Sequence, residues 1–169
     1  MVWADRATRV DWGSRLQLDI ANGVQNKLKF FQQQKKVSEL DKTTFPVDPR
    51  SIVRYQSDYP QVETMPVVEV APHFGVSRLI YVEVESFQTR SSSSVELWRG
   101  EMKATVRVIE VGPDRKAKVG YEEAGVTATF PPKAPQEGVP NLDMPRTYAG
   151  TLDAFTTEVV NRFVTYEKD

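Results

Sequence analysis

Three long runs of alternating residues in the second half of the chain constrain its fold most strongly. Apolar and polar side chains alternate over residues 77–90 and 96–111, and a third, weaker run follows over residues 116–130. Such alternation is typical of β-strands that have one buried and one solvated face. The turn sequence Gly112–Lys116 separates the last two runs. The sequence therefore predicts a mainly antiparallel sheet with one apolar and one charged face.

The side chains of each predicted face can be named. The apolar face is expected to carry Ile80, Val82, Val84, Trp98, Met102, Ala104, Val106 and Val108. The charged face is expected to carry Tyr81, Glu83, Glu85, Arg99, Glu101, Lys103, Thr105 and Arg107. Because Glu83 and Glu85 face basic residues of the next strand, we expect cross-strand ion pairs with Lys103 and Arg107, worth about 0.2–1 kcal/mol each. Gly120 and Gly125 predict bulges in the third strand.

Two long amphipathic helices flank the predicted strands, one over residues 14–33 and one over residues 147–166. Ser14 can cap the first of them. The apolar stripes consist of Leu16, Ile20, Val24, Leu28 and Phe31 in the first helix and Tyr148, Leu152, Phe155, Val159, Phe163 and Tyr166 in the second. We interpret both stripes as facing the core, so that N- and C-terminal helices pack on one face of the sheet. Gly23 marks a place where another element packs closely.

The connecting segments have weaker signals. Val37–Leu40 is expected to form a short strand, and Asp48 followed by Pro49 predicts the start of a short helix. Residues 66–75 fit two structures equally, since their spacing favours a helix whereas their valines favour a strand. The five prolines of Pro131–Pro145 predict an extended crossover with few backbone hydrogen bonds.

Composition limits the class of protein. We expect a single domain over residues 1–169, with 40% hydrophobic residues to form its core. Lys and Arg total 22 against 23 Asp and Glu, which argues against nucleic-acid binding through phosphate contacts. The local basic group Lys27, Lys29, Lys35 and Lys36 is interpreted as solvated charge near a helix end. The absence of cysteine excludes disulfides, thiolate metal sites and cysteine nucleophiles.

Few residues are candidates for catalysis or metal binding. His73 is the only histidine, so neither a histidine metal cluster nor a Ser-His-Asp triad can form. We interpret it as a surface residue. The serines Ser91–Ser94 have no base to activate them, and the chain has no glycine-rich phosphate loop.

Two pairs of carboxylates are candidates for acid–base chemistry. Glu83 and Glu85 share one strand face, an arrangement that glycosidase-type catalysis could use, whereas Glu122 and Glu123 are expected on opposite faces. Charged residues on a wet sheet face need no function, and we interpret all four as surface charges. We therefore predict no catalytic, cofactor-binding or metal-binding residues, no cofactor and no enzymatic activity.

Several segments resemble a group of uncharacterised bacterial envelope proteins, many of which are predicted lipoproteins. The segments are Asp11–Leu28, Val47–Ile52, His73–Val84 and Leu97–Gly100. The order of elements is similar to that of the curli-secretion lipoprotein, the penicillin-binding-protein activator lipoprotein and the amino-terminal domain of TolB. The resemblance implies an α/β (α+β) fold like the TolB amino-terminal and anticodon-binding domains.

The resemblance carries structural and functional expectations. It implies a first strand ending near Trp3, whose beginning the chain lacks, and a lipid-bearing cysteine upstream. It also implies that a helix ends at Phe74–Val76 and leads into a central strand. The expected function is that of a non-enzymatic soluble domain of a cell-envelope lipoprotein on the periplasmic side. It would bind envelope proteins or assemble with itself, through open strand edges or residues 131–145, and would reach the membrane only through its lipid anchor.

A second function stays open beside this one. The chain would then be a cytoplasmic or envelope small-ligand-binding domain, or an enzyme without a clear motif. Its pocket would lie between the sheet and the proline-rich crossover, lined by Tyr81, Glu83 or Glu85.

Overall fold

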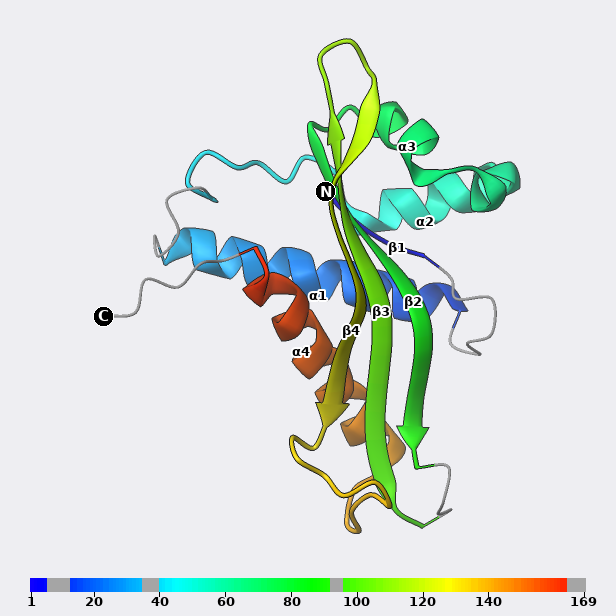
Figure 1. Cartoon of the computed structure of the whole chain (residues 1–169), viewed down its shortest axis with the longest axis vertical. Helices are drawn as coiled ribbons and strands as arrows, with labels where there is room; N and C mark the ends of the chain where they lie inside the picture. The colour runs from blue at the N-terminus through cyan, green and yellow to red at the C-terminus, as the bar shows by residue number, and fades with distance from the viewer. Residues whose placement is uncertain (6–12, 35–39, 92–95, 164–169) are drawn as a thin grey trace.

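The computed structural model describes residues 1–5, 13–34, 40–91 and 96–163. In chain order the elements are β1 (Val2–Asp5), α1 (Gly13–Gln33), α2 (Pro49–Asp58), the 3₁₀ helix η2 (Pro60–Thr64), α3 (Val67–Val70), the 3₁₀ helix η3 (Ala71–Phe74), β2 (Arg78–Arg90), β3 (Trp98–Val111), β4 (Ala117–Phe130) and α4 (Met144–Asn161). The sheet order is β1-β2-β3-β4, with β1 parallel to β2 and the other pairs antiparallel (Figure 1). The fold is therefore mixed α+β with a mainly antiparallel sheet, as the sequence predicted.

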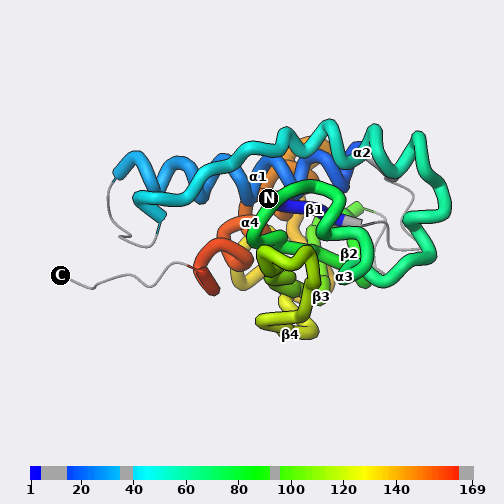
Figure 2. The backbone as a smooth tube through the Cα atoms, turned by 90° about the horizontal axis from the view of Figure 1, so that it is seen from above, coloured from blue at the N-terminus to red at the C-terminus, as the bar shows by residue number. Residues whose placement is uncertain are grey.

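Helices α1 and α2 lie on the β1 side of the sheet, whereas α4 packs mainly against β3 and β4. Seen from above, α1 and α2 lie at the side where β1 forms the edge, and β4 lies farthest from them (Figure 2). Among the described residues, none of these helices is both long enough and apolar enough to span a bilayer.

The three long strands begin and end within two residues of their predicted bounds. The turn Gly112–Lys116 closes the β3–β4 hairpin, with a 2.8 Å hydrogen bond from the Gly112 N–H to the Lys116 carbonyl. β4 is bulged at Gly120 and next to Gly125, as predicted. Gly125 has φ +74°, a backbone conformation that residues with a Cβ rarely adopt.

The main core lies on the face that was predicted to be apolar. There α4 packs against β2, β3 and β4, α1 packs against β1 and α4, and Val82, Val106 and Phe155 are fully buried in one cluster. Removing these apolar surfaces from water supplies most of the stabilisation of such a layer. The placement of the N- and C-terminal helices on one face is thus confirmed.

The opposite face is not open along its whole length, contrary to the sequence prediction. At the end nearest the β3–β4 turn, the segment from α2 to η3 covers it. Leu79, Tyr81 and Ile109 are buried there in a second cluster that includes Trp3 and Ile52. The pattern gave a sign of this, since Leu79 to Val82 is apolar at four consecutive positions, as expected of a strand covered on both faces.

The segment that fitted two structures is helical. Residues Val67–Val70 form α3, the chain continues as η3 past Pro72, and Gly75 ends it. β2 follows directly and lies between β1 and β3, so the helix leads into an inner strand as the resemblance implied. The strand expected to end near Trp3 corresponds to β1. Of the short strand expected at Val37–Leu40, residues 37–39 lie outside the described ranges.

The proline-rich crossover differs from its prediction. Val139 pairs with Trp98 of β3 through two 3.0 Å backbone hydrogen bonds, so the crossover is anchored to the sheet. Its last residues belong to α4, which begins at Met144, three residues before the predicted start. The Asp143 carboxylate caps this helix by accepting a 2.8 Å hydrogen bond from the Arg146 N–H. Pro145 lies in the first turn, where a backbone N–H would have no acceptor within the helix, so its missing N–H costs no hydrogen bond.

The buried face of α4 is also rotated from the predicted stripe. Phe155 and Val159 are buried as expected, but Tyr148 and Leu152 are only half-buried. The helix instead buries Thr147, Thr151, Thr156 and Val160. The predicted stripe was drawn from apolar residues alone, so it did not include the threonines that the helix buries. Tyr166 lies outside the described residues.

Candidate functional site

The predicted ion pairs of the charged sheet face are present. Arg107 on β3 donates to Glu83 on β2 at 2.6 Å and also to Glu122 on β4. One guanidinium thus joins three strands and binds two of the candidate carboxylates. Because its planar fork serves both partners, neither carboxylate is left free for acid–base work.

Glu85 lies in a similar environment. Lys103 Nζ lies 2.9 Å from its carboxylate, and the Thr105 hydroxyl donates to it at 2.8 Å. The hydrogen bond from Lys103, followed by that from Thr105, lowers the pKa of Glu85 below its ordinary value. A general acid needs a raised pKa to hold its proton at neutral pH. The environment of Glu85 therefore disfavours the glycosidase-type role considered for the Glu83–Glu85 pair.

Glu123 faces the opposite way from Glu122, as predicted. It accepts hydrogen bonds from Arg162 at 2.9 and 3.0 Å and from the Tyr121 hydroxyl. The Arg162 bond, followed by that of Tyr121, lowers the pKa of Glu123. Arg162 is the C-terminal cap residue of α4, so this cluster fastens the end of the helix to β4.

The remaining single candidates lie apart from one another. His73 is exposed on η3 beside the Tyr55 ring, with 6.3 Å between the ring centroids. The Ser91 hydroxyl donates to the Gln136 carbonyl at 2.8 Å, and Ser92–Ser94 lie outside the described residues. Within the described part of the chain, no three His, Cys, Asp or Glu side chains come together to hold a metal ion.

The described lysines of the basic group near the end of α1 have partners within the chain. Lys27 Nζ lies 2.7 Å from the Asp153 carboxylate of α4, and Lys29 Nζ lies 5.7 Å from the centre of the Phe45 ring. Lys35 and Lys36 lie outside the described residues.

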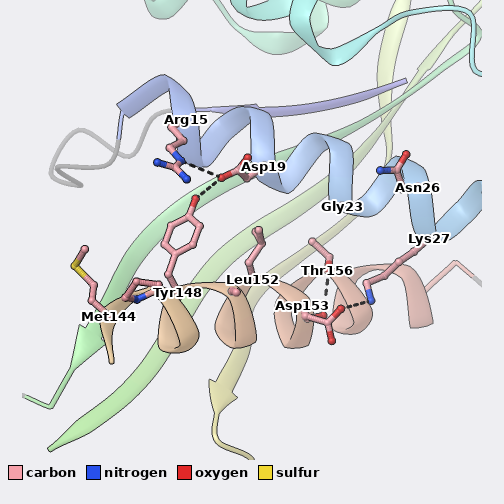
Figure 3. Close-up of a pocket in the computed structure, with 12 residues that line it drawn as sticks. Arg15, Asp19, Gly23, Asn26, Lys27, Met144, Tyr148, Leu152, Asp153 and Thr156 are labelled. Carbon is pink, nitrogen blue, oxygen red and sulfur yellow. Dashed lines mark hydrogen bonds and ion pairs between the residues drawn. The ribbon is translucent and has the colours of Figure 1, made fainter. Parts of the chain in front are cut away.

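One concavity lined by chemically varied side chains is a groove between α1 and α4. We call this the α1–α4 groove; it has a volume of about 650 Å³. Its α1 wall consists of Arg15, Asp19, Gly23, Asn26 and Lys27, and its α4 wall of Met144, Pro145, Tyr148, Ala149, Leu152, Asp153 and Thr156 (Figure 3). The groove lies outside the sequence predictions, which place Tyr148 and Leu152 in the core.

The two helices touch at the narrow end of this groove. A Cβ placed on Gly23 would lie 2.7 Å from Thr156 Cγ2, so the absence of a side chain lets α4 approach α1 there. This is the close packing that Gly23 predicted. From that contact the helices separate toward their N-terminal ends, and Tyr148 spans the gap (Figure 3).

Polar contacts fix both walls of the groove. The Tyr148 hydroxyl donates to Asp19 at 2.6 Å, and Arg15 lies 3.7 Å from the same carboxylate. Burial, followed by the bond to Asp19, raises the pKa of Tyr148, so the phenol stays protonated at neutral pH. Together with the Lys27–Asp153 pair, these contacts place charges at the rim and leave Ala149 and Leu152 in the middle.

The groove can bind but has no evident reactive group. Its acidic and basic side chains already have partners across or along the helices, and its centre is apolar. It also differs in place from the pocket expected between the sheet and the crossover, since Tyr81, Glu83 and Glu85 do not line it.

Comparison with known proteins gives little further guidance. No protein-family model matches the chain, and no curated protein matches it significantly. Among solved structures, the chain is similar to the hypothetical protein CT253 of Chlamydia trachomatis, with 13% identity and a TM-score of 0.34, over 76% of this chain and 67% of that one.

Proposed function

We propose that this chain is a non-enzymatic protein-binding domain of a bacterial cell-envelope lipoprotein. The observation that carries the proposal is the contrast between two surfaces. On the sheet face, the candidate carboxylates Glu83 and Glu85 are held in ion pairs. Between α1 and α4, an open apolar groove has charges only at its rim. An apolar centre with a polar rim is the anatomy of a protein interface.

The envelope part of the proposal rests on the resemblance of Asp11–Leu28 and His73–Val84 to uncharacterised bacterial envelope proteins, many of which are predicted lipoproteins. Of the contact surfaces considered from the sequence, the strand edge of β4 fits the proposal better than residues 131–145. β4 has no strand partner on its outer side among the described residues, so its backbone is open to pairing. The crossover already pairs with β3 through Val139.

A small-ligand-binding function is the second candidate. The α1–α4 groove, at about 650 Å³, lies within the range of small-molecule sites. Such sites place a few polar groups so that they converge on a ligand. Here Tyr148 donates to Asp19 and Lys27 pairs with Asp153, so these polar groups are occupied by one another. The groove therefore fits a protein surface better.

Cell fractionation and cross-linking test the proposal together. A photo-reactive amino acid placed at Ala149, in the groove, is expected to cross-link to another protein in the envelope fraction. The same group at Ser57, an exposed position on α2, is the matched control. Finding the native full-length protein in the cytosol, without a lipid anchor, would refute the envelope function. Equal cross-linking from both positions would refute the groove as the contact surface.

A further inference from the structure

Three concavities meet at the end of the sheet where the β3–β4 turn lies, at the top of Figure 1. Their volumes are about 660, 490 and 590 Å³. Ser77, between η3 and β2, lines all three of them. We call this region the hairpin end and define it as residues 75–78 and 110–118. The hairpin end is therefore hollowed on several sides.

Two of these concavities have basic side chains and no carboxylate in their walls. His73 and Arg115 line the first, and Lys42 and Arg78 line the second. Within the described residues, neither Arg115 nor Lys42 has an ion pair, and both are exposed. Asp41, next to Lys42 in the sequence, is exposed and lines neither concavity. The charges of Arg115 and Lys42 are therefore open to a ligand.

The third concavity adds cations that are only loosely paired. Lys116 lies 3.8 Å from Asp114, while Lys118 and Arg78 share Glu110 at 3.5 and 3.9 Å. These basic side chains are 75–88% exposed, so such pairs contribute little and exchange readily with other anions. The hairpin end thus has four cations against two acids. The rest of the chain has 18 of the 22 Lys and Arg against 21 of the 23 Asp and Glu, so positive charge is concentrated here.

The concavity at Lys42 and Arg78 also has hydrogen-bond donors that suit phosphate. Thr44 and Ser77 line it with hydroxyl groups. Arg78 offers a planar pair of N–H donors and Lys42 a point charge, the two ways in which basic side chains bind phosphate oxygens. Because the wall has cations and donors but no carboxylate, it favours an oxyanion over a cation.

The start of β1 lies at the same end of the molecule. Met1 lines the concavity at Lys42 and Arg78, and its amino group donates to the Arg78 carbonyl at 3.2 Å. The crossover and the N-terminal end of α4 lie at the opposite end (Figure 1). In the proposed function, the lipid-bearing segment precedes β1. Such an anchor brings the hairpin end to the lipid headgroups and leaves the crossover farthest from them.

We propose that the hairpin end binds the anionic phosphate headgroups of the membrane that holds the anchor. Phosphates are bound at Arg115 on one side of Ser77 and at Lys42 and Arg78 on the other. The inference rests on the proposed function and adds a second membrane contact beside the anchor. Few basic side chains give weak, salt-dependent binding to a charged bilayer, so this contact orients the anchored domain and does not replace the anchor.

Vesicle sedimentation with the whole chain tests the inference. Vesicles with equal parts of phosphatidylglycerol and phosphatidylcholine should bind more protein than vesicles of phosphatidylcholine alone. The difference should shrink when sodium chloride is raised from about 50 to about 300 mM. Because the chain has no cysteine, one can be introduced to carry an environment-sensitive dye. The dye emission should shift to shorter wavelengths at Pro113→Cys in the turn but not at Glu137→Cys in the crossover.

A matched pair of double variants locates the binding. Lys42→Glu with Arg115→Glu should lower the partition coefficient onto phosphatidylglycerol vesicles about tenfold or more. Arg54→Glu with Arg146→Glu makes the same change in net charge on α2 and α4, at side chains that are 84% and 72% exposed. This control should change the coefficient less than about threefold. Circular dichroism confirms that each variant is folded.

Three results would overturn the inference. They are equal binding to both kinds of vesicle, equal losses in the two double variants, and displacement by glycerol phosphate beyond that by sodium chloride of equal ionic strength, which would indicate a site for a soluble phosphate. If any of these occurs while envelope cross-links persist, the headgroup inference fails and the proposed function stands. If the vesicles bind as expected but the native protein is cytosolic, the proposed function fails and the headgroup binding stands.

Discussion

Replacing Phe155 by Ala tests the main core most directly. Phe155 on α4 is fully buried in the same cluster as Val106 of β3. The change removes roughly 100 Å² of buried apolar surface, worth about 2.5 kcal/mol. Because α1, the sheet and the rest of α4 hold their positions, the cavity that remains adds about 1–2 kcal/mol. We expect the free energy of unfolding to fall by about 3–5 kcal/mol, measured by urea denaturation followed by circular dichroism.

Phe30 supplies the matched control for this experiment. It lies on α1 with 56% of its surface exposed, so Phe30→Ala makes the same deletion where less than half of the side chain is buried. The cost should stay below about 0.5 kcal/mol, because Ala also favours the helix. Arg99 on the charged face is a poorer reference, since it pairs with Glu101 at 2.6 Å. Equal losses in the two Phe variants, with unchanged denaturant dependence, would show that the core has been placed on the wrong face.

Three further changes test the groove walls and the charged face. Gly23→Ala should destabilise the protein by about 1 kcal/mol in thermal unfolding, because the new Cβ meets Thr156, and this outweighs the better helix propensity of Ala. Adding Thr156→Ser should recover the lost stability. No recovery would rule out the contact with Thr156 as the cause. Tyr148→Phe should lower the free energy of unfolding at pH 7 by about 0.5–1.5 kcal/mol through loss of the bond to Asp19, and an unchanged urea midpoint would contradict this. The pKa of Glu85 is lower in the folded than in the unfolded protein, so the ionised carboxylate stabilises the fold above its unfolded pKa, and this stabilisation is lost as the pH falls through its folded pKa. Glu85→Gln should therefore make the free energy of unfolding depend less on pH below about pH 4.5. Parallel curves of stability against pH for the two proteins would refute this.

Local signals were enough to locate most strands and helices. Alternating apolar and polar residues predict β2, β3 and β4, and the turn Gly112–Lys116 marks where β3 ends and β4 begins. The bulges follow from Gly120 and Gly125, and α2 from Asp48 and Pro49. In each case the interaction that forms the element lies within a few residues of the sequence pattern that predicts it. The ion pairs of Glu83 and Glu85 could also be predicted, because strand register brings neighbouring rows of charge together.

The features that the sequence did not predict depend on distant parts of the chain. Burial of Leu79 and Ile109 requires the segment from α2 to η3 to fold back over the sheet. The α1–α4 groove depends on the angle at which two helices separate from one contact, and the only local trace of it is Gly23. The early start of α4 was missed for another reason. Pro145 was counted with the crossover, although Asp143 before it is a good cap.

The parallel pairing of β1 with β2 has a consequence for how the chain folds. Val2 lies opposite Ile80, whereas β2, β3 and β4 pair with their neighbours in sequence. During synthesis, β1 therefore leaves the ribosome long before its partner exists, and closing so long a loop costs more entropy than closing either hairpin. The β2–β3–β4 meander is expected to form first, with β1 and α1 docking onto it late. Until then Val2 and Trp3, both buried in the finished protein, stay exposed to solvent and to other chains.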